Sequence, residues 1–436
     1  MSDRDLTASG QKSSGAVFIV CPYIVKGAHR VIDPEARLEE AKGLAEAIQL
    51  NVKGTEFFKQ HIIRPATYIS KGHMESLTGP LKGLDINVVF IDAPISPVQQ
   101  RNLEKAWNCK VIDRTGLILE IFGARARTAE GRIQVELAAL TYQRSRLVRS
   151  WTHLERQRGG MGFIGGPGET QLELDRRLID ERIGRIKKEL EDVKRTRALH
   201  RKARKRVPYP VVALVGYTNA GKSTLFNRLT QSDVMAENLL FATLDPTMRR
   251  VRLPSRREII LSDTVGFISD LPTLLVAAFR ATLEEVVEAD LILHVRDISQ
   301  TETDTQNQDV LKVLKDLGLE NVYEDHGIEV LNKCDLLEPD KVKRLQAQAL
   351  RAIHPVQCVI SALEGAGVQD LLDKIDRFLA SKEKTYHFVL PVSDGKRIAW
   401  LYAHGEVLER DDDEADTHIV VKLSLENKER FDQLFA

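Results

Sequence analysis

A glycine-rich segment with the spacing of a phosphate-binding loop lies in residues 211–224 (VVALVGYTNAGKST). An apolar run ends at Gly216, four residues follow, and then Gly221, Lys222 and Ser223 precede a predicted helix. Glycines let the backbone wrap an anion, so that N–H groups and the helix N-terminus face phosphate oxygens. We expect Lys222 to reach the β- and γ-phosphates and the Ser223 hydroxyl to ligate Mg²⁺. The complete spacing disfavours the alternative, a glycine turn without a ligand.

A second phosphate-sensing segment is predicted at 263–266 (DTVG), after a predicted strand at 257–261. The Asp263 carboxylate can hold the Mg²⁺ shell, and the Gly266 amide can sense a γ-phosphate. The next residue is Phe267, where a Ras-type enzyme carries the glutamine that orients water. Because phenylalanine cannot orient water, we expect unstimulated hydrolysis to be slow and to depend on groups supplied elsewhere, such as by a partner.

Two further segments predict recognition of guanine. Residues 332–335 (NKCD) follow a predicted strand at 328–331, and residues 361–363 (SAL) follow another at 358–360. Asp335 can accept hydrogen bonds from the N1 and N2 donors of guanine, which adenine lacks, and such a polar mismatch discriminates strongly. The backbone of 361–363 can contact guanine O6. The ordered set favours a GTPase over the alternative of a P-loop kinase for small molecules.

Residues 241–247 (FATLDPT) are expected to form a mobile segment that supplies a threonine to Mg²⁺ and the γ-phosphate. On sequence alone Thr243 and Thr247 compete for this role. The alternative for either is turn chemistry beside Asp245 and Pro246.

No residue is assigned as a certain catalytic group, and we expect Lys222, Thr243 and Gly266 to position the phosphates and the water. The predicted nucleotide contacts are Gly216, Tyr217, Thr218, Asn219, Ala220, Gly221, Lys222, Ser223, Phe241, Ala242, Thr243, Leu244, Asp245, Asp263, Thr264, Val265, Gly266, Asn332, Lys333, Cys334, Asp335, Ser361, Ala362 and Leu363.

The elements that position these residues predict a multidomain α/β protein. A polar, disordered tail is expected at 1–15, followed by an N-terminal α/β domain with a small parallel sheet at 16–125. A basic helical hairpin is expected at 126–207 and a P-loop GTPase domain with a doubly wound sheet at 208–381. A linker at 381–385 then leads to a small α+β domain at 385–436, with an acidic solvated loop at 411–414.

The predicted hairpin has apolar stripes at heptad spacing in 133–154 and 172–193, so the two helices should pair antiparallel. Its outer faces are dense in basic residues, which favours binding to a nucleic-acid phosphate backbone over a merely solubilising surface. These residues are Arg144, Arg146, Arg149, Arg156, Arg158, Lys194, Arg195, Arg197, Arg201, Lys202, Arg204, Lys205 and Arg206.

A glycine-rich loop at 159–171 is expected to join the two helices as a flexible finger that orders on a partner. It carries Met161, Phe163 and Ile164, which can stack on or wedge into RNA, beside Arg156 and Arg158. The alternative is a second, dinucleotide-type site at 160–165. It is disfavoured because no strand precedes that segment.

Bulk composition excludes several classes. The chain has 436 residues, 43% of them hydrophobic, and a formal net charge of +0. Its four cysteines lack metal-site spacing, which argues for a reducing compartment and against structural zinc. No apolar run reaches transmembrane length and no signal-peptide core is present, so we expect a soluble, cytoplasmic protein, monomeric because nothing demands more.

Taken together, GGMGFIGGPGETQLE, GYTNAGKST, FATLDPT, DTVGF and NKCD resemble the motifs of HflX-type GTPases, of the TRAFAC class and Obg-HflX superfamily. The resemblance covers the chain from about residue 16 to its end. It implies GTP and Mg²⁺ as cofactors, with Ser223 and Thr243 as the metal ligands. It also implies binding to the large ribosomal subunit and its rRNA, and the splitting or rescue of stalled ribosomes under stress. The apolar residue at Phe267 agrees with this family.

The resemblance further implies that the finger reaches rRNA near the peptidyl-transferase centre, and it implies no DNA partner. A different hypothesis is an RNA chaperone or remodelling NTPase that acts through its N-terminal half, with ATP. The sequence offers no ATP motif in that half.

Overall fold

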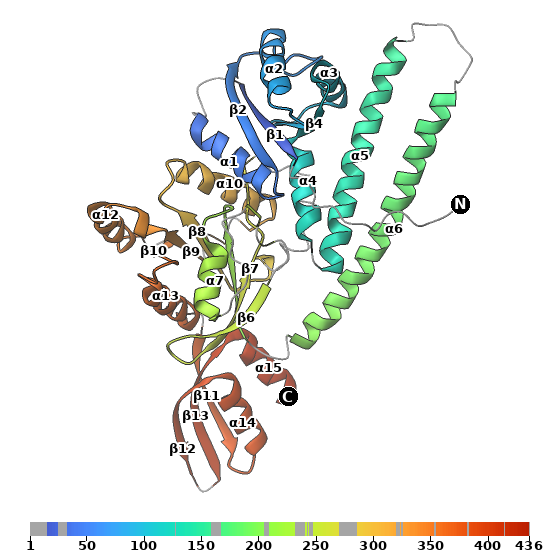
Figure 1. The fold of residues 1–436 in the computed structure, drawn as a ribbon. Coiled ribbons are helices and arrows are strands. Elements are labelled where there is room, and N and C mark those ends of the chain that lie inside the picture. The colour runs from blue at the N-terminus through green and yellow to red at the C-terminus, as the bar shows by residue number, and fades with distance from the viewer. Residues whose placement is uncertain are drawn as a thin grey trace, which may run out of the picture.

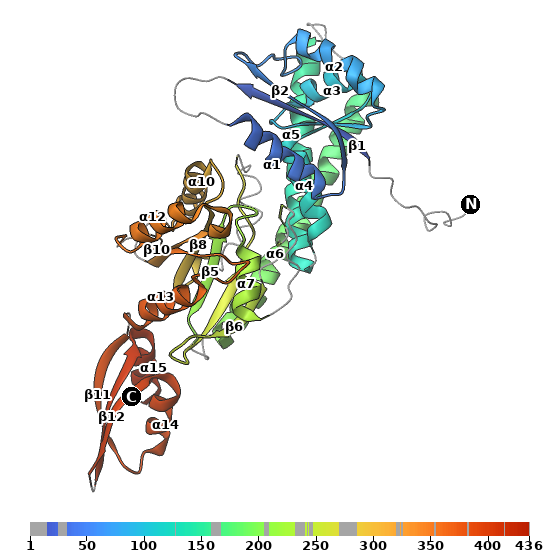
Figure 2. The same cartoon turned by 60° about the vertical axis from the view of Figure 1, so that its left-hand side comes forward.

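The computed structural model describes residues 15–24, 33–126, 128–157, 167–204, 209–231, 240–241, 243, 247–269, 286–319, 323, 326–352, 355–381, 383–413 and 415–435. Over these residues the chain forms three separate β-sheets and a long helical hairpin, arranged along an elongated molecule (Figures 1 and 2). The multidomain α/β fold expected from the sequence is confirmed. Within the described ranges, no helix has both the length and the apolar character that a membrane span requires.

The first sheet has four parallel strands in the order β2-β1-β3-β4. They are β1 (Ala16–Ile24), β2 (Asn51–Gln60), β3 (Val88–Ile91) and β4 (Lys110–Asp113). Helices α1 (Pro34–Glu46) and α4 (Arg114–Arg125) pack on one face, and α2 (Lys71–Gly83) and α3 (Pro97–Trp107) on the other. The pair Asp33-Pro34 is typical of a helix start, and in the structure Asp33 caps α1 and Pro34 begins it, because the first helical position needs no N–H. Strand β2 and helix α2 were not predicted.

The hairpin consists of α5 (Ala129–Gln157) and α6 (Pro167–Arg204), which lie side by side as predicted (Figure 1). Ile183 and Ile186 are buried along their contact. Two ion pairs cross between the helices, Arg144–Asp180 at 3.1 Å and Arg182–Glu136 at 2.8 Å.

The prediction that the glycine-rich loop extends to residue 171 is wrong, because α6 begins at Pro167. Proline fits the first turn of a helix, where its missing N–H has no intrahelical partner. The loop residues Arg158, Met161, Phe163 and Ile164 lie outside the described residues, and Arg156 is described only as part of α5.

The central sheet has six strands in the order β10-β9-β8-β5-β7-β6. They are β5 (Val211–Gly216), β6 (Thr247–Arg252), β7 (Glu258–Asp263), β8 (Leu291–Asp297), β9 (Gly327–Asn332) and β10 (Val356–Val359). All neighbours are parallel except the edge strand β6, which runs antiparallel to β7 and was not predicted. The apolar spacing of residues 274–286 predicts a helix, but this segment falls almost wholly outside the described residues.

Helices cover both faces of this sheet. Helices α7 (Lys222–Thr230) and α13 (Val368–Ser381) share one apolar core, and α10 (Thr303–Asp316) shares the other with α1 and α4 of the N-terminal sheet. Helix α12 (Pro339–Ala349) packs beside β10. Because the carboxyl ends of parallel strands meet at one edge, the segments after β5, β7 and β9 converge there.

The third sheet is antiparallel, with β11 (Glu383–Pro391), β13 (Asp416–Ser424) and β12 (Glu406–Asp412) in that order. Helices α14 (Gly395–His404) and α15 (Leu425–Phe435) complete its core. Two predictions here are wrong. The expected linker is absent as such, because α13 extends to Ser381 and β11 already begins at Glu383. The acidic residues Asp411 and Asp412 lie in β12 rather than in a loop, although both are exposed.

Candidate functional site: a nucleotide-binding edge

The loop between β5 and α7 has the backbone of a phosphate cradle. Gly216 and Gly221 have φ angles of 150° and 93°, in the region that favours glycine. A Cβ at Gly216 would lie 2.2 Å from the Val295 carbonyl oxygen, and one at Gly221 would lie 2.2 Å from Asn332 Nδ2. Both positions therefore require glycine, and α7 begins immediately afterwards with its N-terminus facing the cradle.

Lys222 lies within this cradle, where only 6% of its surface is exposed. Its Nζ donates a hydrogen bond to the Tyr217 carbonyl oxygen at 2.8 Å. Burial lowers the pKa of Lys222 to about 8, an effect that Asp263 partly opposes. An anion in the cradle would stabilise the charged form of this ammonium group.

Three oxygen-bearing side chains meet beside Lys222. Ser223 Oγ donates to Asp263 Oδ2 at 2.7 Å, Thr243 Oγ1 donates to the same oxygen at 2.9 Å, and the two hydroxyls lie 2.9 Å apart. Asp263 is fully buried, and its Oδ1 has no hydrogen-bond partner among the described residues. Burial raises the pKa of Asp263, while Lys222 and the hydroxyls oppose that shift. This set of hard oxygen donors around a buried carboxylate fits Mg²⁺.

The structure also separates the two threonine candidates. Thr243 lies beside Ser223, whereas Thr247 begins strand β6 and pairs with Asp263 through the sheet register. The neighbouring predicted contacts Ala242, Leu244 and Asp245 lie outside the described residues.

Asn332, after β9, joins the cradle to the segment 361–363. Its Nδ2 donates to the Ala220 carbonyl oxygen at 2.8 Å, and its Oδ1 accepts from the Ala362 amide at 2.9 Å. The predicted contact of that amide with guanine O6 would therefore have to be shared with Asn332. Arg228 of α7 holds the same segment by donating to the Ala362 carbonyl at 2.5 Å.

The predicted guanine-recognition segment follows Asn332 as a tight turn. Lys333 has φ of 65°, and its Nζ pairs with Asp297 at 2.7 Å. The short 3-10 helix η2 (Cys334–Leu336) then carries Asp335, whose Oδ1 has no hydrogen-bond partner among the described residues. A buried acceptor of this kind suits the paired N–H donors of guanine. Asp297 was not predicted as a site residue, although it ends the buried strand β8 at the same edge of the sheet.

The segment after β7 lies along the phosphate cradle as an added strand. The Phe267 amide donates to the Gly216 carbonyl at 3.1 Å, and the Phe267 carbonyl accepts from the Thr218 amide at 2.7 Å. A Cβ on Gly266 would lie 3.0 Å from Lys222 Nζ, so the glycine backbone lies directly against the lysine. Phe267 itself is 1% exposed and packs in the core shared with the N-terminal sheet, so its side chain cannot reach a water molecule at the phosphates.

Several predicted contact residues direct their side chains away from the cradle. Phe241 is buried against Phe122 of α4, with ring centroids 4.7 Å apart, and Val265 and Tyr217 join the same core. The Thr264 hydroxyl donates to the Leu214 carbonyl at 2.6 Å. These residues can contact a nucleotide only through their backbone, because their side chains are held in the core beside α1 and α4 or, for Thr264, against strand β5.

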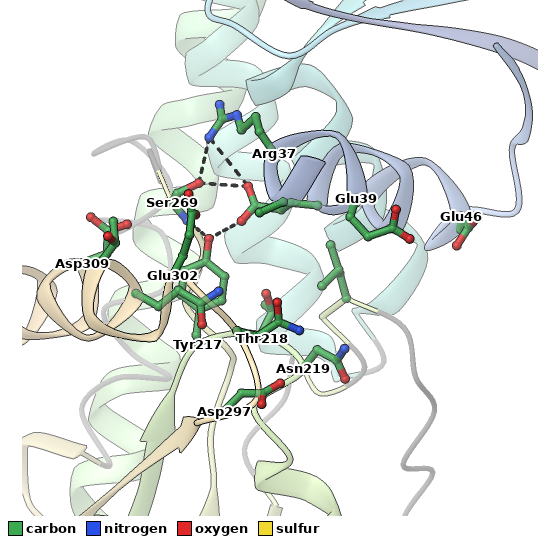
Figure 3. A pocket seen from close by; sticks show the side chains of 17 residues that line it. Arg37, Glu39, Glu46, Tyr217, Thr218, Asn219, Ser269, Asp297, Glu302 and Asp309 are labelled. Atoms are coloured by element: carbon green, nitrogen blue, oxygen red, sulfur yellow. Dashed lines mark hydrogen bonds and ion pairs between the residues drawn. The ribbon is translucent and has the colours of Figure 1, made fainter. Parts of the chain in front are cut away.

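A cavity of about 250 Å³ opens between α1, the cradle and α10 (Figure 3). Thr218, Asn219 and Asp297 line its floor at the nucleotide edge, and Arg37 and Glu302 line its walls. The cavity extends the cradle toward the N-terminal sheet.

The basic face of the hairpin is only partly available for a partner. Arg144 pairs with Asp180, and Arg146 lies over the Tyr142 ring with its guanidinium near Asp113 at 3.5 Å. Arg146 therefore contacts the N-terminal domain, which corrects its prediction as an outer-face residue, whereas the Arg144 side chain is 41% exposed and remains at the surface.

Comparison with known proteins gives consistent matches along the chain. Family models described as "GTP-binding GTPase N-terminal", "GTP-binding GTPase Middle Region", "50S ribosome-binding GTPase" and "HflX C-terminal domain" match residues 35–123, 125–204, 211–333 and 348–434.

Curated relatives match over similar lengths. The chain is 50% identical to the GTPase HflX of Magnetococcus marinus, over 89% of this chain and 88% of that protein. It is 44% identical to the GTPase HflX of Caldanaerobacter subterraneus, over 91% and 90% of the two chains. It is 45% identical to the GTPase HflX of Escherichia coli, over 76% of each.

Proposed function

The chain belongs to the HflX family of GTPases, which hydrolyse GTP to GDP and phosphate, and we propose that GTP controls its affinity for the large ribosomal subunit. With this change of affinity the protein would split or rescue stalled ribosomes. The observation that carries this proposal is the convergence of the phosphate cradle, the Ser223–Thr243–Asp263 cluster and Asp335 at one edge of the central sheet, in a chain that also extends a long basic hairpin. The protein would act as a monomer in the cytoplasm, where ribosomes are found.

The roles within the site follow from the contacts. The cradle amides and Lys222 would hold the β- and γ-phosphates, and the Gly266 amide beside Lys222 would contact the γ-phosphate. Ser223 and Thr243 would hold Mg²⁺, with Asp263 fixing both hydroxyls, and the ion would neutralise charge on the phosphates. Asp335 would select guanine.

Hydrolysis by the protein alone should be slow. The residue after Gly266 is buried in the core between the two sheets, so this segment offers no side chain to orient the attacking water. The large subunit would supply or position the missing group, and ribosomes would therefore stimulate turnover.

Attachment to rRNA would come from the hairpin. The sequence that joins its two helices contains Arg158, Met161, Phe163 and Ile164, and Arg156 precedes it, a combination of phosphate-binding and base-stacking residue types. Such contacts are sequence-tolerant and sensitive to salt, as expected for a factor that binds a folded rRNA surface.

Co-sedimentation with purified large subunits tests the proposal. We expect retention with a non-hydrolysable GTP analogue, weaker retention with GDP, and a steep loss as salt rises from about 50 to about 200 mM. Binding to phosphates releases counterions, and added salt makes that release less favourable. The control is Lys71→Met, a change at an exposed residue of α2 in the N-terminal domain. The double variant Arg156→Gln/Arg158→Gln should lose retention in both nucleotide states. Retention that ignores nucleotide and salt, or that survives this double change, would refute the proposal.

A further inference from the structure

A cluster of buried and half-buried charged and hydroxyl groups joins α1 and α4 to Ser269, in the segment that follows β7. Figure 3 shows Arg37, Tyr217 and Ser269 of this cluster. Ser269, three residues after Gly266, lies at its centre. The Ser269 hydroxyl donates to Glu40 Oε1 at 2.9 Å and accepts from Arg37 Nη1 at 2.9 Å. Arg114 Nη2 donates to the Ser269 carbonyl at 2.9 Å and pairs with Glu40 at 2.5 Å. The N-terminal domain thus holds both the backbone and the hydroxyl of this one serine.

The phosphate cradle takes part in the same cluster through Tyr217, the residue after Gly216. The Tyr217 hydroxyl accepts from the Ser269 amide at 2.7 Å and donates to Glu40. Tyr217 is only 6% exposed, and burial together with the neighbouring Glu40 raises the pKa of its hydroxyl, so it remains a donor. A cradle residue, Ser269 and a carboxylate of the N-terminal domain therefore meet at one point.

Asp92, the residue after β3, pairs with both arginines of the cluster. Its buried carboxylate pairs with Arg114 Nη1 and with Arg37 Nε, each at 2.5 Å. Burial raises the pKa of Asp92, but the two arginines lower it below its ordinary value, so the carboxylate stays charged. Moving Ser269 out of this arrangement would break its hydrogen bonds with Arg37, Glu40 and Arg114, and unmade hydrogen bonds of buried groups are costly.

The segment between the cluster and the nucleotide is short and has little freedom. Phe267 pairs with the cradle backbone on both of its sides, and Ser269 is held two residues later. Gly266 is thereby pressed against Lys222, where the γ-phosphate is expected. A shift of the Gly266 amide must either displace Ser269 from the cluster or move the N-terminal domain with it.

We propose that Glu40, Arg114 and Tyr217 are positioning residues for GTP hydrolysis. By holding Ser269, they set the place of the Gly266 amide relative to the γ-phosphate, and they couple that phosphate to the position of the N-terminal domain. The coupling concerns the hydrolytic step of the isolated protein and does not depend on ribosome binding.

The test compares two conservative changes with two matched controls in the full chain, without ribosomes. Tyr217→Phe removes one hydroxyl of the cluster, and Tyr323→Phe removes a buried hydroxyl of the same domain that contacts His294 instead. Glu40→Gln removes the charge beside Arg114, and Glu39→Gln removes a neighbouring charge that is exposed on α1. The measurements are single-turnover hydrolysis, and equilibrium affinities for fluorescent GDP and for a fluorescent non-hydrolysable GTP analogue.

For both cluster variants we expect the rate of hydrolysis and the ratio of analogue affinity to GDP affinity each to fall about tenfold, the loss of one well-placed interaction. GDP affinity itself should stay unchanged, because the cradle contacts to the β-phosphate remain. Both controls should behave as the unsubstituted protein. Thermal unfolding identifies any variant that fails to fold, in which case Ser269→Ala replaces it. An unchanged affinity ratio and rate, even with a lower melting temperature, would show that the cluster only joins the two domains and would overturn the proposal.

Discussion

Replacing Arg114 with methionine should destabilise the N-terminal domain strongly, because Arg114 is the charge that the buried cluster depends on. The side chain is 2% exposed and contacts Asp92 and Glu40 at 2.5 Å each, and Ser269 at 2.9 Å. Methionine fills much of the same volume but leaves the fully buried Asp92 with Arg37 as its remaining partner.

Removing one partner of a buried ion pair typically costs about 3–5 kcal/mol. We expect the lower end, about 3 kcal/mol, because Arg37 still holds Asp92 and Tyr217 still donates to Glu40. At about 1.4 kcal/mol per factor of ten, this lowers the ratio of folded to unfolded protein roughly a hundredfold. The exposed change Lys71→Met, which loses a surface pair with Glu75, should cost well under about 1 kcal/mol.

The assay is urea unfolding followed by the fluorescence of Trp107, which is 3% exposed in α3, in a background where Trp151 and Trp400 are replaced by phenylalanine. The double variant Asp92→Asn/Arg114→Met should lose less stability than the two single variants added together, since both singles remove the same ion pair. Additive losses, or a cost for Arg114→Met no larger than that of Lys71→Met, would refute the assignment.

The effect should also depend on pH with a definite sign. The pKa of Asp92 is lowered in the folded protein from its ordinary value of 3.8, so the stability that this group contributes is present above that value. It is lost as pH falls through the lower folded pKa. Arg114→Met weakens the lowering, so the difference between the variant and the unsubstituted protein should be largest near neutral pH and should shrink in acid.

Two further predictions concern the nucleotide site. Asp335→Asn should shift preference from GTP toward xanthosine triphosphate, because the asparagine amide presents a donor to the position where guanine also donates. Competition binding with GTP, ATP and xanthosine triphosphate measures this preference. A retained preference for guanine would contradict the role of Asp335. Lys222→Met should abolish GTP binding yet stabilise the nucleotide-free protein by about 3 kcal/mol below pH 8. Burial lowers the pKa of Lys222 from 10.5 to about 8, so the folded protein is destabilised by the charged form of this lysine at pH values below 8. That gain should disappear as pH rises from 8 toward 10.5, and a gain in melting temperature that is constant over this range would exclude burial of the charge as its cause.

The motifs that directly follow strands were predicted from the sequence alone. The cradle, Asp263 and the segment 332–335 each follow an apolar strand directly, and parallel strands place their carboxyl ends at one edge. The hairpin was readable because its apolar residues keep heptad spacing over several turns. In both cases the information lies in short stretches of chain.

Three strands that lie at edges of the sheets were not predicted from the sequence. Strands β2, β6 and β12 carry many charged residues and are half-exposed, so their patterns do not stand out from loops. Their place is decided by pairing with a neighbour that lies far away in the chain or across a turn. The start of α6 at Pro167 and the absence of the expected linker after α13 were likewise set by packing.

The side-chain directions at the site were decided by tertiary structure alone. Sequence spacing assigned Tyr217 and Phe241 to the nucleotide, but their side chains contact helices α1 and α4 of the N-terminal domain instead. The cluster of Arg114, Glu40 and Ser269 joins residues separated by as many as 229 positions, and no local pattern encodes such contacts. A local motif determines which groups follow one strand, because neighbouring residues in the chain form it. The packing of the two domains determines which side chains lie beside that motif, because those side chains come from distant parts of the chain.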